Sequence, residues 1–204
     1  MIKNVVFDFG QVLVRFEPAY MVGQYVTQPE DAALLEKVVF DRLYWDRLDA
    51  GTITDEAVME AVKTRLPERL WSVAKTIYYN WIYNIPEIEG MRDLILYIKD
   101  KYGASVFVLS NISVYFADHS GEIPILDLVD GCIFSSKCGR VKPERDIYEY
   151  LCSHFDIIPE ETVFVDDRAD NIEGARSVGI DGYLFDGNAA KLKNYLDEKF
   201  PKNV

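Results

Sequence analysis

The chain has 204 residues, of which 49% are hydrophobic and 27% are charged, and its mean hydropathy is -0.07. These values are typical of a globular protein with one core domain and a modest insert, and they exclude two large independent domains. The formal net charge is -12 and no basic stripe is present, so the chain lacks the cations that release counterions from a nucleic-acid backbone, and we expect no nucleic-acid partner.

The three cysteines, Cys132, Cys138 and Cys152, are odd in number and form no CxxC pair. This pattern indicates neither a disulfide framework nor a thiolate zinc site. Asp8 comes too early for the apolar region of a signal peptide to precede it, and no stretch approaches the ~20 apolar residues of a membrane span. We therefore expect a cytoplasmic protein without membrane contact, as a monomer or a weak homodimer.

Short apolar runs recur along the chain and predict strands that are buried on both faces, as in a parallel sheet. They cover residues 5–7, 106–109, 132–134 and 162–165, with a weaker run at 183–185. Helical patterns lie between them, one ending at the capping residue Gly103 and another following Pro143. The alternation predicts an α/β domain with a doubly wound parallel sheet.

Residues 16–85 break this rhythm, because their apolar side chains recur at helical spacing and suggest no strand. Thr54 is suited to cap a helix that opens with acidic residues. We expect an all-helical insert over residues 16–85 and a catalytic core built from residues 1–15 and 86–204. Most aromatic residues of the insert are expected in its own core, with residues 44–49 as candidates for facing a site.

Polar residues follow four of the predicted strands, at the edge of a parallel sheet where ligands bind. In chain order they are Asp8 and Gly10, then Ser110 and Asn111, then Lys142, and finally Asp166 and Asp167 with Asp170 and Asn171 nearby. A single such residue is more often a helix cap, but the convergence of four groups favours a functional site.

The residue types at this edge suit phosphate chemistry. Clustered carboxylates repel one another unless a cation lies among them, and oxygen ligands without His or Cys favour Mg²⁺. Lys142 and Ser110 can donate to a phosphate group, and an aspartate can attack phosphorus to form an aspartyl-phosphate.

Four segments resemble the motifs of the haloacid dehalogenase-like superfamily, in the family's order. They are FDFGQVL at residues 7–13, LSN at 109–111, KP at 142–143 and FVDDRADNI at 164–172. The FDxGxVL opening is similar to that of a subgroup that includes a sugar-1-phosphate phosphatase. The resemblance implies a Rossmann-like core with an inserted helical cap that opens and closes, and a Mg²⁺-dependent phosphatase acting on a small phosphorylated metabolite, with a sugar phosphate as a first candidate.

The resemblance also implies roles for individual residues. Asp8 would be the nucleophile and a metal ligand, the Gly10 carbonyl and Asp167 further metal ligands, and Asp166 an auxiliary ligand or a support behind them. Ser110 and Asn111 would bind the phosphoryl group that Lys142 neutralises, so that Asp8 and Lys142 carry the catalysis.

Gly10 departs from the family pattern, in which a second aspartate two residues after the nucleophile serves as general acid and base. General acid catalysis contributes typically ~100-fold to ~10,000-fold, most for poor leaving groups. Without that acid, the site is expected to prefer esters such as hexose 1-phosphates over 6-phosphates. Three alternatives stay open: a haloacid dehalogenase, a receiver-type phosphoacceptor, whose acidic residues occur in the reverse order, and a catalytically weak phosphate-binding protein.

Overall fold

The computed structural model describes residues 2–200, in which five parallel strands form a single sheet of order β3-β2-β1-β4-β5. The strands are β1 (Asn4–Phe7), β2 (Ser105–Ser110), β3 (Gly131–Phe134), β4 (Thr162–Asp166) and β5 (Asp181–Leu184). Each coincides with a predicted apolar run to within a few residues. The prediction of a parallel α/β sheet is confirmed.

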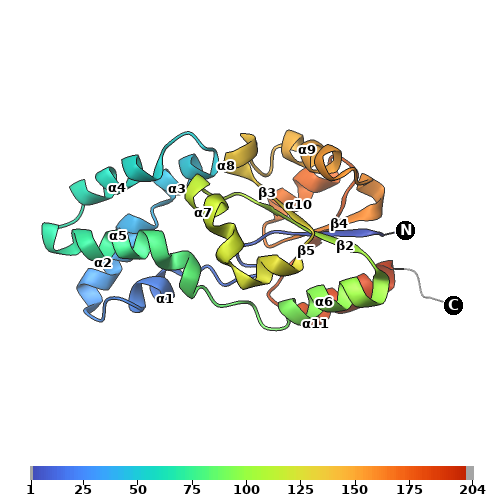
Figure 1. The fold of residues 1–204 in the computed structure, drawn as a ribbon, viewed down its shortest axis with the longest axis horizontal. Coiled ribbons are helices and arrows are strands. Elements are labelled where there is room, and N and C mark those ends of the chain that lie inside the picture. Colours follow the sequence, from blue (N-terminus) through green and yellow to red (C-terminus); the bar gives the residue numbers. More distant parts are fainter. Residues whose placement is uncertain (1, 201–204) are drawn as a thin grey trace.

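Alternate side chains of the central strand enter two separate apolar clusters, which is why the sheet needs helices on both faces. Val5 and Phe7 pack with the inner sides of α6 (Met91–Tyr102) and α11 (Ala189–Lys199). Val6 packs with α9 (Arg145–Phe155) and α10 (Ala169–Arg176) on the opposite face (Figure 1). The sheet is therefore doubly wound.

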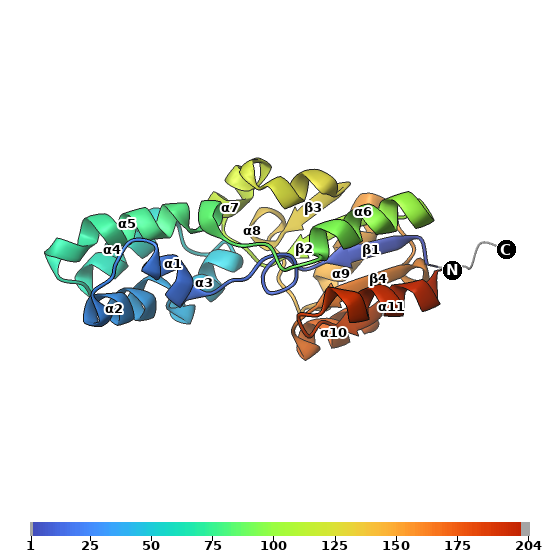
Figure 2. The same ribbon diagram turned by 90° about the horizontal axis from the view of Figure 1, so that it is seen from below.

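Between β1 and α6, residues 18–84 form helices and, within the described chain, no strand. The α-helices are α1 (Pro18–Gly23), α2 (Pro29–Val39), α3 (Arg42–Asp49), α4 (Asp55–Thr64) and α5 (Trp71–Asn80), with the 3-10 turns η1 (Glu68–Leu70) and η2 (Trp81–Asn84). The Thr54 hydroxyl accepts a hydrogen bond from Ala57 N and caps α4, as its sequence context predicted. We call residues 16–85 the helical segment; it occupies one end of an elongated molecule (Figures 1 and 2).

The helical segment is joined to the sheet through α7 (Val114–His119) and α8 (Ser135–Cys138). The Trp81 ring stacks on Phe116 of α7, with centroids 5.7 Å apart. The Tyr115 hydroxyl donates a hydrogen bond of 3.1 Å to the Tyr79 carbonyl. The 3-10 turns η3 (Ser120–Glu122), η4 (Pro124–Leu128) and η5 (Pro159–Glu161) complete the fold. Across residues 2–200, no helix has the length and apolar character needed to cross a bilayer.

Candidate active site

The strands β2 and β3 lie on one side of β1, and β4 and β5 lie on its other side, so the chain switches sides between β1 and β4. A cavity of about 400 Å³ opens at the carboxyl ends of these two strands. This is the position at which open α/β sheets bind ligands. Residues from both parts of the molecule line it: Asp8, Phe9, Gly10, Gln11, Ser110, Asn111, Ile112, Val141, Lys142, Asp167, Arg168 and Asn171 from the core, and Phe16, Arg42, Trp45, Asp46, Asp49, Ala50, Trp81 and Ile85 from the helical segment.

A buried ammonium group joins two of the carboxylates. Lys142 Nζ lies 2.9 Å from Asp8 Oδ1 and 2.7 Å from Asp166 Oδ2, and its side chain is 1% exposed. Asp8 Oδ1 also accepts a hydrogen bond of 2.7 Å from the Phe9 amide. No hydrogen bond to Asp8 Oδ2 occurs among residues 2–200, which leaves that atom available to a ligand or a reacting group.

Asp166 is fully buried, and all of its acceptor sites are in use. Its Oδ1 accepts from the Arg168 amide and from Asn171 Nδ2, and its Oδ2 accepts from Asn171 Nδ2 and Lys142 Nζ, at 2.7–3.0 Å. A carboxylate offers about four lone-pair positions. We therefore propose that Asp166 holds Lys142 in place, and that Asn171, to which the sequence analysis assigned no role, holds Asp166.

The segment that carries Lys142 is fixed by Asn111. The Asn111 amide oxygen accepts from Lys142 N at 2.8 Å, and its Nδ2 donates to the Lys142 carbonyl at 2.9 Å. The family resemblance implied that Asn111 binds the phosphoryl group. Because both ends of its amide already hold the Lys142 backbone, we propose that its main task is to position Lys142.

Asp8, Asp166 and Asp167 each present an oxygen within 4.8 Å of the other two. Burial raises the pKa of the Asp8 carboxyl to about 6 against the opposing effect of Lys142, and burial together with Asp166 raises the pKa of Asp167. Burial disfavours the charged form of Lys142, but the two carboxylates beside it raise its pKa. Burial and the negative charge of Asp166 both disfavour ionisation of Asp8 and Asp167. A divalent cation bound between Asp8 and Asp167 would therefore be strongly stabilised.

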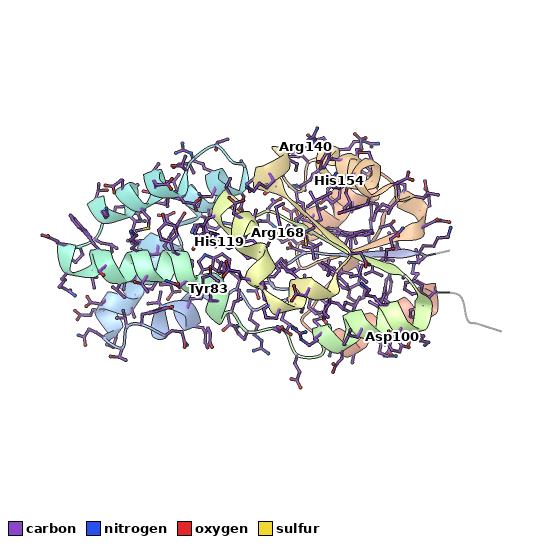
Figure 3. The ribbon with its side chains drawn as sticks, in the orientation of Figure 1. Tyr83, Asp100, His119, Arg140, His154 and Arg168 are labelled. Atoms are coloured by element: carbon purple, nitrogen blue, oxygen red, sulfur yellow. The ribbon has the colours of Figure 1, made fainter. Side chains whose placement is uncertain are left out.

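The remaining core residues complete one wall of the cavity. Ser110 is buried at the end of β2, and the Gln11 side chain donates to the Phe16 carbonyl at 3.0 Å. Gln11 adopts φ 59°, a left-handed conformation that turns the chain sharply after Gly10. Arg168, near the centre of Figure 3, pairs with the exposed Asp170 at 2.8 Å. Arg168 lines the cavity and Asp170 does not.

The two histidines lie on α7 and α9 and line no part of the cavity (Figure 3). His119 Nδ1 contacts the Tyr115 carbonyl at 2.8 Å, and His154 packs beside Tyr150 and Phe155. Their contacts are structural.

The helical segment contributes an aromatic wall and three charged side chains. The rings of Phe16, Trp45 and Trp81 lie 5.2–5.5 Å apart in every pairing. Arg42, Asp46 and Asp49 of α3 reach the same cavity. The sequence indicates residues 44–49 as candidates for facing the site but does not distinguish among them. Their helical spacing marks which residues share a face of α3, but only the docking of α3 on α8 shows which face meets the site.

The family model described as haloacid dehalogenase-like hydrolase matches residues 2–179. The chain belongs to the haloacid dehalogenase-like hydrolases. This confirms the family that the four motifs indicated.

Two curated relatives resemble the chain along most of its length. The D-ribitol-5-phosphate phosphatase of Bacteroides thetaiotaomicron is 25% identical over 192 residues, covering 90% of this chain and 91% of the relative. The sesquiterpene phosphatase of Aspergillus oryzae is 25% identical over 181 residues, covering 88% of each chain.

Solved structures of the family share the fold. A haloacid dehalogenase-like hydrolase from Porphyromonas gingivalis superposes with a TM-score of 0.72 at 21% identity, covering 99% of this chain and 100% of that one. A family enzyme from B. thetaiotaomicron in complex with magnesium and inorganic phosphate gives 0.68 at 20% identity, covering 92% and 96%. A dehalogenase gives 0.67 at 19% identity, covering 89% and 83%.

Proposed function

We propose that the protein is a Mg²⁺-dependent phosphatase that hydrolyses a small phosphate monoester through an aspartyl-phosphate at Asp8. The observation that carries this proposal is the grouping of Asp8, Asp167 and the buried Lys142 at one wall of a 400 Å³ cavity. Two relatives similar over most of the chain are named phosphatases, which supports the same reaction.

The residues present fit a magnesium ion. Asp8 and Asp167 offer carboxylate oxygens and Gly10 lines the same cavity, and an all-oxygen donor set suits this hard cation. Asp8, Asp167 and the Gly10 carbonyl would hold the ion, whose charge would offset that of the phosphoryl oxygens.

The chain's own residues account for the covalent steps. An Asp8 carboxylate oxygen attacks phosphorus, and the bond from phosphorus to the ester oxygen breaks. Water then attacks the phosphorus of the aspartyl-phosphate, the bond to Asp8 breaks, and phosphate leaves with Asp8 restored. Lys142 lies within 2.9 Å of Asp8 and would stabilise the negative charge that builds up on the transferring group. Ser110 would donate to a phosphoryl oxygen from the end of β2.

A sugar or polyol phosphate is the substrate class that we propose. Arg42, Asp46 and Asp49 offer polar partners for hydroxyl groups, and the aromatic wall offers flat faces to a sugar ring. The relative that acts on D-ribitol 5-phosphate, by its name, supports this class.

The test is a screen of phosphate monoesters with Mg²⁺ and with excess chelator. Hydrolysis is expected only with the ion, because two carboxylates would otherwise face the anionic substrate. Asp167→Ala is expected to raise the Mg²⁺ concentration needed for half-maximal activity at least ~10-fold. Full activity in chelator, or turnover of 2-haloacids in place of phosphate esters, would instead favour the dehalogenase alternative.

A further inference from the structure

We propose that Asp49, contributed by α3 of the helical segment, is the general acid and base that protonates the leaving oxygen in place of an aspartate at Gly10. The inference rests on the proposed phosphatase function and adds a catalytic residue to it. Asp49 lines the same cavity as Asp8, Gly10 and Lys142.

The carboxyl group of Asp49 has an unused acceptor. Its Oδ1 is shielded from solvent, yet it has no hydrogen-bond partner among residues 2–200. Leaving a buried polar atom unpaired is destabilising, so such atoms are uncommon away from sites that use them. A proton on this carboxyl, shared with an oxygen of a bound ester, would satisfy it.

The backbone of Asp49 is held in register with the core. The fully buried Ser135 of α8 donates a hydrogen bond of 2.5 Å to the Asp49 carbonyl, and its Oγ accepts one of 3.0 Å from the Ile112 amide. Ile112 directly follows Ser110 and Asn111. One hydroxyl therefore joins the end of α3 to the loop after β2, which fixes the backbone of Asp49 relative to Ser110 and Asn111 in the same cavity.

The electrostatic surroundings suit proton transfer near neutral pH. Burial raises the pKa of the Asp49 carboxyl to about 7, with Arg42 and Lys142 opposing the rise and Asp46 and Asp8 adding to it. The helix α8, which packs against α3, contributes the uncharged side chains of Ser135 and Ser136 near Asp49. A general acid and base works best when its pKa is close to the working pH.

Asp49 accounts for both proton transfers of the proposed reaction. When Asp8 displaces the ester oxygen, the protonated Asp49 gives its proton to that oxygen and becomes a carboxylate. In the second step the carboxylate takes a proton from the water that attacks phosphorus. Phosphate leaves, and both aspartates return to their starting forms.

The experiment compares three aromatic esters, namely 4-nitrophenyl, phenyl and benzyl phosphate, with Mg²⁺ present. Their leaving groups need increasing help from an acid, while ring size stays nearly constant. For Asp49→Asn we expect kcat/KM to fall at least ~100-fold on benzyl phosphate and only a few-fold on 4-nitrophenyl phosphate. In the wild type, kcat/KM on benzyl phosphate should decline as pH rises through about 7, because Asp49 loses its proton, and this decline should be absent from the variant.

Two variants make the comparison specific. Glu36→Gln removes an equal charge from α2 of the helical segment, at an exposed residue that does not line the cavity, and should leave the ranking of the esters unchanged. Gly10→Asp in the Asp49→Asn background should restore benzyl phosphate turnover, because a Cβ at Gly10 would meet only Phe16 Cβ, at 4.0 Å. An equal loss on all three esters in Asp49→Asn would overturn the assignment while leaving the phosphatase intact. Failure of the wild type to hydrolyse even 4-nitrophenyl phosphate would instead overturn the proposed function.

Discussion

At the scale of single residues, Lys142 contributes to the stability of the fold as well as to the catalytic role that its motif suggested. The family resemblance implied only that Lys142 neutralises the phosphoryl group and takes part in catalysis. The side chain is 1% exposed and lies between Asp8 and Asp166, so its loss leaves Asp166 buried without its counter-charge. Removing one partner of a buried ion pair is strongly destabilising.

Lys142→Ala is therefore expected to lower both kcat/KM and the free energy of unfolding, the latter by on the order of 3 kcal/mol. Urea unfolding followed by circular dichroism measures the second effect. Lys137→Ala is the matched control, since Lys137 makes an exposed ion pair with Asp118. Equal stability of the two variants would show that Asp166 does not depend on Lys142.

The residues on the strand ends could be predicted because their positions follow from local patterns. Asp8 and Ser110 come directly after an apolar run and Asp167 comes two residues after one, and parallel strands bring such ends together. Asp49 could not be predicted in this way. It lies near the end of a short helix, and its place at the cavity depends on how α3 packs against α8.

At the scale of secondary-structure elements, the contact between α3 and α8 decides where the helical segment meets the core. The Ser135 hydroxyl of α8 donates to Asp49 of α3 and accepts from Ile112 in the loop after β2. The neighbouring Ser136 has a buried Oγ without a partner among the described residues. Gly51, at φ 67°, brings the chain past Ser136, where a Cβ would meet the Ser136 carbonyl oxygen at 3.2 Å.

These neighbouring serines form a matched pair for mutation. Ser135→Ala leaves the Ile112 amide and the Asp49 carbonyl unpaired and is expected to cost about 1–3 kcal/mol of stability. It should also lower kcat/KM on benzyl phosphate more than on 4-nitrophenyl phosphate. Ser136→Ala removes a buried hydroxyl that has no partner among the described residues, and is expected to preserve or raise stability. Denaturant unfolding of both variants measures the difference, and a reversed order would contradict the assigned contacts.

At the scale of the whole molecule, the sheet and its helices were predictable and the relative placement of the two parts was not. Five buried runs with alternating helices allow few arrangements, since parallel connections are short and of one hand. The helices of residues 16–85 were recognisable by their spacing, but α1 and α3 are short and their roles come from tertiary contacts. The cavity between the parts therefore had to be observed.

The proposed mechanism requires that Asp8 becomes phosphorylated during turnover. The direct measurement is acid quenching within milliseconds of mixing enzyme, Mg²⁺ and 4-nitrophenyl phosphate, followed by mass spectrometry of the proteolysed chain. We expect the mass of one phosphoryl group on the peptide that contains Asp8, its absence in Asp8→Asn, and its presence in Asp100→Asn, a control on α6 far from the cavity (Figure 3). Hydrolysis with a normal rate in a folded Asp8→Asn variant, or a phosphoryl group on another residue, would contradict the claim.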